Sequence, residues 1–210
     1  MNDLLLRTAT GLVLIILALA ASLKGGNVFA FAVAAAATAV FYEWSRLVRG
    51  WGAGWQVSGF FYALVPALAL LWVRERDVHG AMLLLWLFIV TWSTDIGGYF
   101  AGRAFGRRKL APSISPSKTF AGLYGGMSAA TVLGGAWALF TGLGQALLIL
   151  APLFALAAQG GDLFQSWMKR RAGVKDSGNL LPGHGGVFDR LDGLVPVAVL
   201  TALAQVASLT

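Results

Sequence analysis

Residues 80–100 read GAMLLLWLFIVTWSTDIGGYF, an apolar run as long as a membrane-spanning helix requires. A bilayer core about 30 Å thick is crossed by about 20 helical residues. The one charged side chain in the run, Asp95, lies near its C-terminal end. A carboxylate at that depth is costly, so we expect a basic side chain or a metal ion beside it. The stretch therefore predicts a transmembrane helix with a polar site at one end.

Similar apolar runs fill most of the 210-residue chain, which is 58% hydrophobic and 12% charged. Soluble domains have about twice that charged fraction. We therefore predict a single domain over residues 1–210, an all-α polytopic membrane helix bundle of about seven transmembrane helices. The expected spans are 8–23, 28–47, 57–73, 80–100, 119–140, 143–164 and 187–209. Residues 1–94 hold the N-terminal spans, and residues 95–210 hold the polar half that carries the chemistry. Ala18-Leu19-Ala20 also resembles a signal-peptide cleavage site, which is the alternative for the first span.

Basic residues are distributed unevenly between the two sides of this bundle. With the N-terminus in the cytoplasm, 13 of the 16 Lys and Arg residues lie in cytoplasmic segments, a bias typical of membrane proteins. The polar loops 102–118 and 169–186 are therefore expected in the cytoplasm. We assign the net charge of +7 to topology and to anionic ligands, and predict no nucleic-acid partner. The absence of Cys excludes disulfides and thiolate metal sites.

The longest polar block, residues 166–192, reads SWMKRRAGVKDSGNLLPGHGGVFDRLD. Its cations, flexible glycines and carboxylates together suit a polyphosphate with a divalent metal. As the sixth helix leaves the membrane, one face is expected to carry residues spaced by three or four: Asp162, Ser166, and Lys169 or Arg170. The Pro-Gly-His-Gly-Gly turn at 182–186 allows the backbone to approach a ligand closely. These features predict a phosphate-binding site.

Further polar residues are expected to complete this site. Asp189 and Asp192 are predicted on one face of the last helix. Ser115, Lys118 and Thr119 are expected at the start of the fifth helix, where hydroxyls, an ammonium group and free backbone amides can hold phosphate. We therefore expect the two cytoplasmic loops to form halves of one site.

The 166–192 block resembles the signature of the phosphatidate cytidylyltransferase family. That pattern is Ser-x-x-Lys-Arg-x-x-x-x-Lys-Asp, followed by Pro-x-His-Gly-Gly-x-x-Asp-Arg-x-Asp. The chain matches it at Ser166, Lys169-Arg170, Lys175-Asp176, Pro182, His184-Gly185-Gly186, Asp189-Arg190 and Asp192. Further matches are Asp95, Tyr99-Phe100, Gly102-Arg103 and Ser115-Pro116. The chain departs from the family at Ser117 and Ala121, where Lys and Glu are usual, and it is shorter than typical members by about two spans.

The resemblance implies an enzyme of phospholipid biosynthesis that condenses CTP with phosphatidate, giving CDP-diacylglycerol and pyrophosphate. It implies Mg²⁺ at Asp162 and Asp189, with K⁺ as a second, monovalent cation. Asp192, Lys169 and Arg170 are expected to act with these carboxylates in catalysis. The expected substrate contacts are Ser115, Lys118, Thr119, Ser166, Lys175, Asp176, His184, Gly185, Gly186, Arg190, Asp95 and Arg103. The expected partners are CTP, phosphatidate, membrane lipids and a second copy of the chain in a homodimer. The location implied is the inner (cytoplasmic) membrane, with the active site facing the cytoplasm.

Two other classes of function stay open at this point. A non-enzymatic binder or transporter of anionic lipids would place polar residues along a path through several spans, whereas here they cluster at span ends. Another membrane lipid phosphotransferase is the second class. A CDP-alcohol phosphatidyltransferase, for example, carries Asp-Gly-x-x-Ala-Arg, which Asp95-Ile-Gly-Gly does not supply.

Some small and polar residues have a structural interpretation. The pairs Gly25-Gly26, Gly97-Gly98 and Gly125-Gly126 are expected to serve helix packing rather than phosphate binding. Glu43 is expected to be structural, paired with Arg46 or with interfacial water.

Overall fold

The computed structural model describes residues 3–76 and 78–209, and these ranges form eight helices and one two-stranded hairpin. In chain order the elements are α1 Asp3–Lys24, α2 Gly26–Leu47, α3 Ala53–Glu75, α4 Gly80–Phe105, β1 Lys109–Ala111, β2 Ser115–Thr119, α5 Phe120–Thr141, α6 Ala146–Arg171, α7 Phe188–Leu191 and α8 Leu194–Val206. The expected helical bundle is therefore present, and the hairpin is a small departure from an all-α fold.

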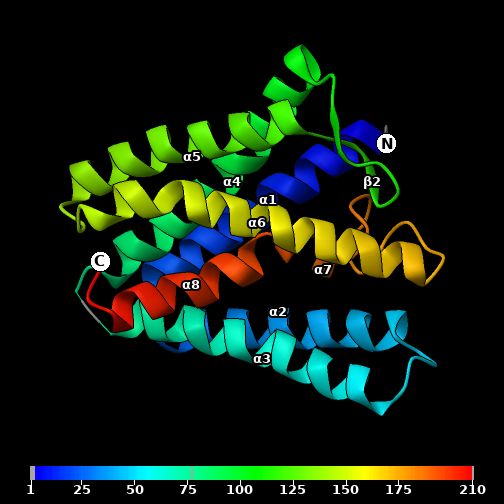
Figure 1. Cartoon of the computed structure of the whole chain (residues 1–210). Helices are drawn as coiled ribbons and strands as arrows, with labels where there is room; N and C mark the ends of the chain where they lie inside the picture. The colour runs from blue at the N-terminus through cyan, green and yellow to red at the C-terminus, as the bar shows by residue number, and fades with distance from the viewer. Residues whose placement is uncertain (1–2, 77, 210) are drawn as a thin grey trace.

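The helices pack in a bundle whose two ends differ in character (Figure 1). Helices α4 and α5 pack together on one side, α2 and α3 form the opposite side, and α6 and α8 lie between them (Figure 1). The hairpin, the C-terminal end of α6 and the loop before α7 gather at the end where α1 begins (Figure 1). We call this the polar end. Segments far apart in the sequence meet there, and the C-terminus lies at the other end.

Five helices of the described chain are long and apolar enough to cross a bilayer, namely α2 to α6. The apolar part of α1, Thr8–Lys24, and the whole of α8 are shorter. Helix α8 has 13 residues, so it covers about 20 Å of a hydrocarbon core about 30 Å thick. The protein is therefore integral to a membrane, while the predicted count of seven full spans is not confirmed.

The predicted continuous last span, 187–209, is wrong. The structure divides it into α7, which has four residues, and α8, which begins at Leu194. Pro196 lacks a backbone N–H and suits the first turn of a helix, so it favours a fresh start at that point. The Gly193 N–H is bonded instead to Asp192 Oδ1, at 2.7 Å. Asp189 and Asp192 therefore belong to the short helix α7 and its C-terminal cap, not to one long helix.

Helix α6 and the segment before α5 also differ from the prediction. Helix α6 continues past the expected membrane span, which ends at residue 164, to Arg171, so Lys169 and Arg170 lie on its last turn, as their spacing from Asp162 and Ser166 predicts. Three basic residues there complement the helix dipole, and Gly173 with φ +71° follows the end of the helix. Residues expected to start the fifth helix form strand β2 instead, paired antiparallel with β1.

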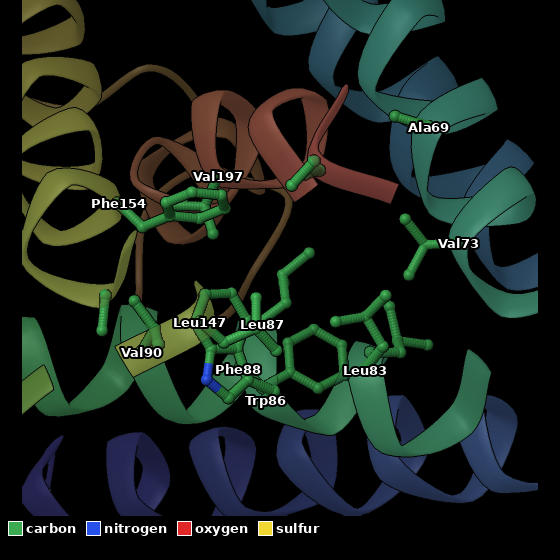
Figure 2. Close-up of a cluster of buried hydrophobic side chains, with 14 of the residues drawn as sticks. Ala69, Val73, Leu83, Trp86, Leu87, Phe88, Val90, Leu147, Phe154 and Val197 are labelled. Carbon is green, nitrogen blue, oxygen red and sulfur yellow. The ribbon is translucent and has the colours of Figure 1, made fainter. Parts of the chain in front are cut away.

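The core of the bundle lies between α4, α6 and α8, where Trp86, Leu87, Phe154 and Val197 are buried together (Figure 2). Glycines bring α4 and α5 into close contact. A Cβ at Gly97 would lie 2.7 Å from the Gly125 carbonyl oxygen. The helix-packing interpretation of Gly97-Gly98 and Gly125-Gly126 is therefore confirmed.

For Gly25-Gly26 the helix-packing interpretation is wrong. Gly25 forms the turn between α1 and α2 and Gly26 begins α2, with φ angles of +66° and +53° that glycine adopts without strain. The guanidinium of Arg74 occupies the space where a Cβ at Gly25 would stand.

Aromatic side chains cover the polar end of α2, α3 and α6. Trp51, Trp55 and Trp167, here called the tryptophan cluster, have ring centroids 5.1 to 6.2 Å apart. The guanidinium of Arg171 lies over all three rings, at 4.3 Å from the Trp51 centroid. Tryptophan is enriched where hydrocarbon meets the lipid headgroups, so the cluster marks a membrane interface at this end.

Candidate active site

Two cavities at the polar end share Asp95 in their walls. The first, of about 490 Å³, lies beside the hairpin and has basic residues around it: Arg103, Lys109 and Lys118. The second, of about 360 Å³, lies between α1, α4 and the residues after the glycine-rich turn. Its ionisable lining is Asp95, His184, Asp189, Arg190 and Asp192. The two predicted halves of the site therefore adjoin.

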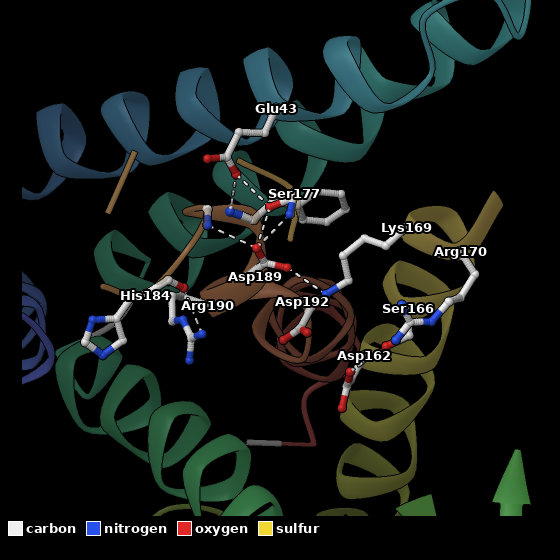
Figure 3. A network of polar contacts seen from close by, with 12 residues as sticks. Glu43, Asp162, Ser166, Lys169, Arg170, Ser177, His184, Asp189, Arg190 and Asp192 are labelled. Atoms are coloured by element: carbon white, nitrogen blue, oxygen red, sulfur yellow. Dashed lines mark hydrogen bonds and ion pairs between the residues drawn. The ribbon is translucent and has the colours of Figure 1, made fainter. Parts of the chain in front are cut away.

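Asp189 of α7 is held by donors on both carboxylate oxygens (Figure 3). Its Oδ2 accepts hydrogen bonds from the backbone N–H groups of Ser177 and Gly186, at 2.8 and 3.0 Å. Its Oδ1 accepts from Lys169 Nζ at 2.7 Å. Burial by itself raises the pKa of Asp189, but Lys169 and the two N–H groups outweigh it and hold the pKa below its ordinary value. Asp189 is therefore a fixed anion.

Asp162 of α6 forms a second pair with a lysine, and this pair joins the hairpin to the helix. Lys118 Nζ lies 2.5 Å from Asp162 Oδ2 and also reaches Gln159 Oε1, at 3.4 Å. Ser166, one turn later, donates to Asp162 Oδ1 at 3.3 Å. The predicted common face of Asp162 and Ser166 is thus confirmed, and Lys118 from the other half of the site contacts it.

Asp192, between α7 and α8, completes a group of three carboxylates. It lies within electrostatic range of Asp162, Asp95 and Lys169. Burial, then the charge of Asp162, raises the pKa of Asp192 to about 7, partly offset by its bond from Gly193 N–H. Excess negative charge at this point favours a bound cation or additional basic groups.

Glu43 of α2 is a site residue whose partners the sequence did not reveal. It is fully buried, and its carboxylate accepts from the N–H groups of Val187 and Phe188, at 3.1 and 2.8 Å. Ser177 Oγ lies 3.0 Å from Glu43 Oε2 and 2.9 Å from Asp189 Oδ2 (Figure 3). The expectation that Glu43 pairs with Arg46 or water is wrong. Glu43 fixes the loop that carries Asp189.

The glycine-rich turn brings backbone close to carboxylates of the protein itself. Gly185 has φ +82°, which disfavours any other residue. A Cβ at Gly186 would collide with Ser177 Oγ and with the Glu43 carboxylate. The sequence predicted that this backbone approaches a ligand closely. At Gly186 the backbone N–H instead donates to Asp189 and helps to position it.

His184 faces the second cavity. Its ring packs against α1, with Nε2 3.4 Å from the position of a Cβ at Gly11. Its buried Nδ1 has no hydrogen-bond partner among residues 3–76 and 78–209. Arg190 donates to the His184 carbonyl oxygen at 2.9 Å, which steadies this side of the cavity.

Other predicted site residues have mainly structural contacts. Arg170 donates to the Ile114 carbonyl oxygen at the hairpin tip, 3.2 Å away. The Thr119 hydroxyl accepts from Gly122 N–H at 3.0 Å and caps α5. Arg103 donates to the Tyr99 hydroxyl at 2.9 Å and lines the first cavity. The predicted site residues absent from the walls of both cavities are Asp162, Ser166, Lys169, Arg170, Gly185, Gly186, the exposed Lys175 and Asp176, and the half-buried Ser115.

Comparison with known proteins assigns the chain to a family. Residues 50–207, which contain both cavities' acidic residues, match the cytidylyltransferase family. The chain belongs to that family.

Relatives within the cytidylyltransferases cover most of the chain. A phosphatidate cytidylyltransferase of Brucella suis biovar 1 (strain 1330) is 47% identical over 176 residues, which are 82% of this chain and 63% of that protein. The phosphatidate cytidylyltransferase of Pseudomonas aeruginosa (PAO1) is 38% identical over 177 residues, 81% of this chain and 65% of that protein. That of Bacillus subtilis (strain 168) is 44% identical over 123 residues, 57% and 46% of the respective chains. The chain thus spans less than two thirds of the length of these relatives.

The candidate site has oxygen ligands suited to Mg²⁺ but no preassembled cage. Within the described ranges, no three His, Asp or Glu side chains are grouped closely enough to hold a metal ion. Asp162 and Asp189 nevertheless share one arrangement. In each, one carboxylate oxygen accepts a hydrogen bond from another donor and the other oxygen pairs with a lysine ammonium group. Carboxylate oxygens are hard ligands, so their chemistry fits Mg²⁺.

Proposed function

We propose that this chain transfers the cytidylyl group of CTP to phosphatidate, giving CDP-diacylglycerol and pyrophosphate. The observation that carries the proposal is the pairing of Lys118 with Asp162 and of Lys169 with Asp189 beside two adjoining polar cavities. An ammonium group held by a carboxylate at a cavity wall can turn toward phosphate oxygens by side-chain rotation alone. The name that the relatives carry, phosphatidate cytidylyltransferase, supports the same chemistry.

In the proposed reaction a phosphate oxygen of phosphatidate attacks the α-phosphorus of CTP. The bond from the α-phosphorus to the oxygen bridging to the β-phosphate breaks, and pyrophosphate leaves with the electron pair. Phosphatidate is already anionic near neutral pH, so the step requires no protein nucleophile. Catalysis then consists of positioning two anionic substrates and neutralising their charge.

In this proposal the two cavities divide the phosphates between them. Lys118 and Arg103 bind phosphate oxygens in the cavity beside the hairpin. Arg190 does so in the cavity between α1 and α4, and Lys169 does so by turning from Asp189, which lines that cavity. His184 donates a hydrogen bond at the wall of that second cavity. Asp95 and Asp192 orient the basic side chains around them.

We further propose that Asp162 and Asp189 hold Mg²⁺, beside a monovalent cation such as K⁺. Bound there, Mg²⁺ supplies neutralisation of the negative charge on the phosphates. Removal of divalent cations with a chelator should abolish turnover, and Mg²⁺ should restore it. Turnover that persists in excess chelator would contradict this part of the proposal.

The function is tested with purified protein in detergent, labelled CTP, phosphatidate and Mg²⁺. We expect a labelled liponucleotide, released pyrophosphate, and no phosphorylated lipid when ATP replaces CTP. Transfer of a γ-phosphoryl group from ATP to lipid would instead assign the chain to the lipid kinases. Lipid binding without turnover would support a non-enzymatic binder.

We also propose that the polar end, with the N-terminus, faces the cytoplasm, because 13 of the 16 basic residues then lie inside. The chain has no Cys, so single cysteines report topology directly. Asn179→Cys, in the exposed loop of the polar end, should resist a membrane-impermeant thiol reagent in intact cells. Val78→Cys, between α3 and α4 at the other end, should react. Labelling of Asn179→Cys and not of Val78→Cys would show that the orientation is the opposite of the proposed one. A homodimer is part of the same proposal, and the mass of the protein–detergent particle tests it.

A further inference from the structure

An apolar cavity of about 160 Å³ lies inside the bundle, apart from the two polar ones. One face of α2 lines it from Phe29 to Val40. That stretch of helix covers about 16 Å, so the cavity is elongated along α2 rather than spherical. Its long axis runs from the polar end toward the opposite side of the membrane.

Small side chains create this space. Alanines face it from four helices, including Ala21 of α1, Ala36 of α2, Ala67 of α3 and Ala198 of α8. The neighbouring core around Trp86 and Leu87 is filled by large side chains instead. An apolar void of this kind does not retain water and loses van der Waals contacts, so an apolar ligand that fills it gains them.

The apolar cavity adjoins the second polar cavity, with only apolar side chains between them. Four residues line both: Ala18, Phe88, Leu191 and Leu194. Beyond them, the polar cavity is lined by His184, Asp189 and Arg190. A molecule with an anionic group in the polar cavity can therefore extend an alkyl chain into the apolar one without crossing a polar region.

We propose that the apolar cavity binds part of one acyl chain of phosphatidate. This inference rests on the proposed function, because it places the phosphate group of that lipid in the adjoining polar cavity. An apolar cavity of comparable volume holds a benzene-sized ligand, so this one takes about six carbons. The remainder of the chain extends into the bilayer.

Filling the cavity tests the proposal. Ala36→Leu or Ala67→Leu should raise the KM for dioleoyl phosphatidate at least about tenfold, because several methylene groups lose their burial. The KM for CTP, and the KM for dibutyryl phosphatidate, should each change by less than about twofold. Ala35→Leu is the matched control, since Ala35 is exposed on the same helix and does not line the cavity. An equal KM for dioleoyl phosphatidate in all three variants and the wild type would overturn the acyl site.

Photo-labelling provides a measurement that needs neither turnover nor a variant. Phosphatidate with a diazirine a few carbons from the ester should label the cavity face of α2 or α3, at positions between Phe29 and Val40 or between Tyr62 and Leu70. Labelling confined to lipid-facing residues such as Phe31 and Phe60 would contradict the proposal. The two proposals can be refuted independently. A protein that makes no liponucleotide refutes the proposed function. A protein that makes liponucleotide but is labelled only at its outer surface refutes the acyl site.

Discussion

The two lysine–carboxylate pairs of the polar end contain the same chemical groups but are held very differently. Asp189 is 6% exposed, and two backbone N–H groups fix it in addition to Lys169. Asp162 is 25% exposed, and beyond Lys118 its carboxylate has a single long bond from Ser166. The Asp189 pair is thus part of the fold as well as of the site, whereas the Asp162 pair can open without disturbing the chain around it.

The largest effect is expected for Asp189→Asn. Turnover should fall at least about 10²-fold, as for loss of an electrostatic catalytic group. The free energy of unfolding should also fall by about 2–4 kcal/mol. Either the NH₂ group of the new amide faces the backbone N–H donors, or its oxygen accepts from them without the negative charge that strengthened those hydrogen bonds. Liponucleotide formation and the thermal unfolding midpoint in detergent measure the two effects. An unchanged midpoint would show that Asp189 is as loosely held as Asp162.

Asp162→Asn should affect activity alone. We expect a fall in turnover of at least about 10²-fold. The unfolding midpoint should stay within about 2 °C, since the partly exposed ion pair contributes little to stability. Glu75→Gln, at an exposed carboxylate of the other end, is the control and should retain turnover. Near-normal Mg²⁺-dependent turnover in both Asp162→Asn and Asp189→Asn would remove the metal from the proposed position.

Glu43→Gln tests whether the position of the Lys169–Asp189 pair depends on the contact with α2. The substitution keeps one acceptor oxygen for the N–H groups of Val187 and Phe188 but loses the charge, so the loop carrying Asp189 should loosen. We expect kcat to fall about tenfold while the KM for CTP changes little, the pattern for a residue that positions another. Glu75→Gln is the control, because Glu75 also accepts a backbone N–H, from Gly26, at the other end. A change in KM alone would mean that Glu43 acts on substrate binding.

The smallest effect is expected for Lys118→Ala, in the pair that opens. Loss of one ammonium group should raise the KM for a substrate about fivefold and leave kcat within about threefold, as for an interaction present before and during the chemical step. Lys118→Arg should recover part of the affinity. Arg107→Ala, an exposed cation absent from the walls of either cavity, should behave like the wild type. A larger loss in kcat than in KM would place Lys118 in the transition state.

Features that depend on local periodicity could be predicted from the sequence. The run around Asp95 forms α4, the spacing of Asp162 and Ser166 places them together, and Gly97 and Gly125 pack one helix on another. The break before α8 was missed because the predicted last span joined the charged stretch 187–193 to the apolar run that follows it. Gly193 and Pro196 were the available signals there.

Contacts between distant segments could not be predicted in the same way. Glu43 is 134 residues from Ser177 in the chain, and no local pattern links a carboxylate on one helix to a turn that far away. The hairpin posed the same difficulty, because β2 is identified by its pairing with β1 and not by its own composition. Lys118 therefore had a predicted role but no predicted partner.

The tryptophan cluster sets the depth of the site relative to the lipid headgroups. Arg171 stacks on these rings, and Lys169 precedes it by two residues, a rise of about 3 Å along α6. Rings of this kind settle at the headgroup level, so Lys169 stands close to the plane in which phospholipid phosphates already lie. In the proposed reaction the lipid substrate reaches the enzyme by two-dimensional diffusion within its own leaflet, without leaving the membrane. Only CTP must arrive from water. The encounter rate with phosphatidate therefore depends on the amount of lipid per unit area of membrane, and the encounter rate with CTP depends on its concentration per unit volume.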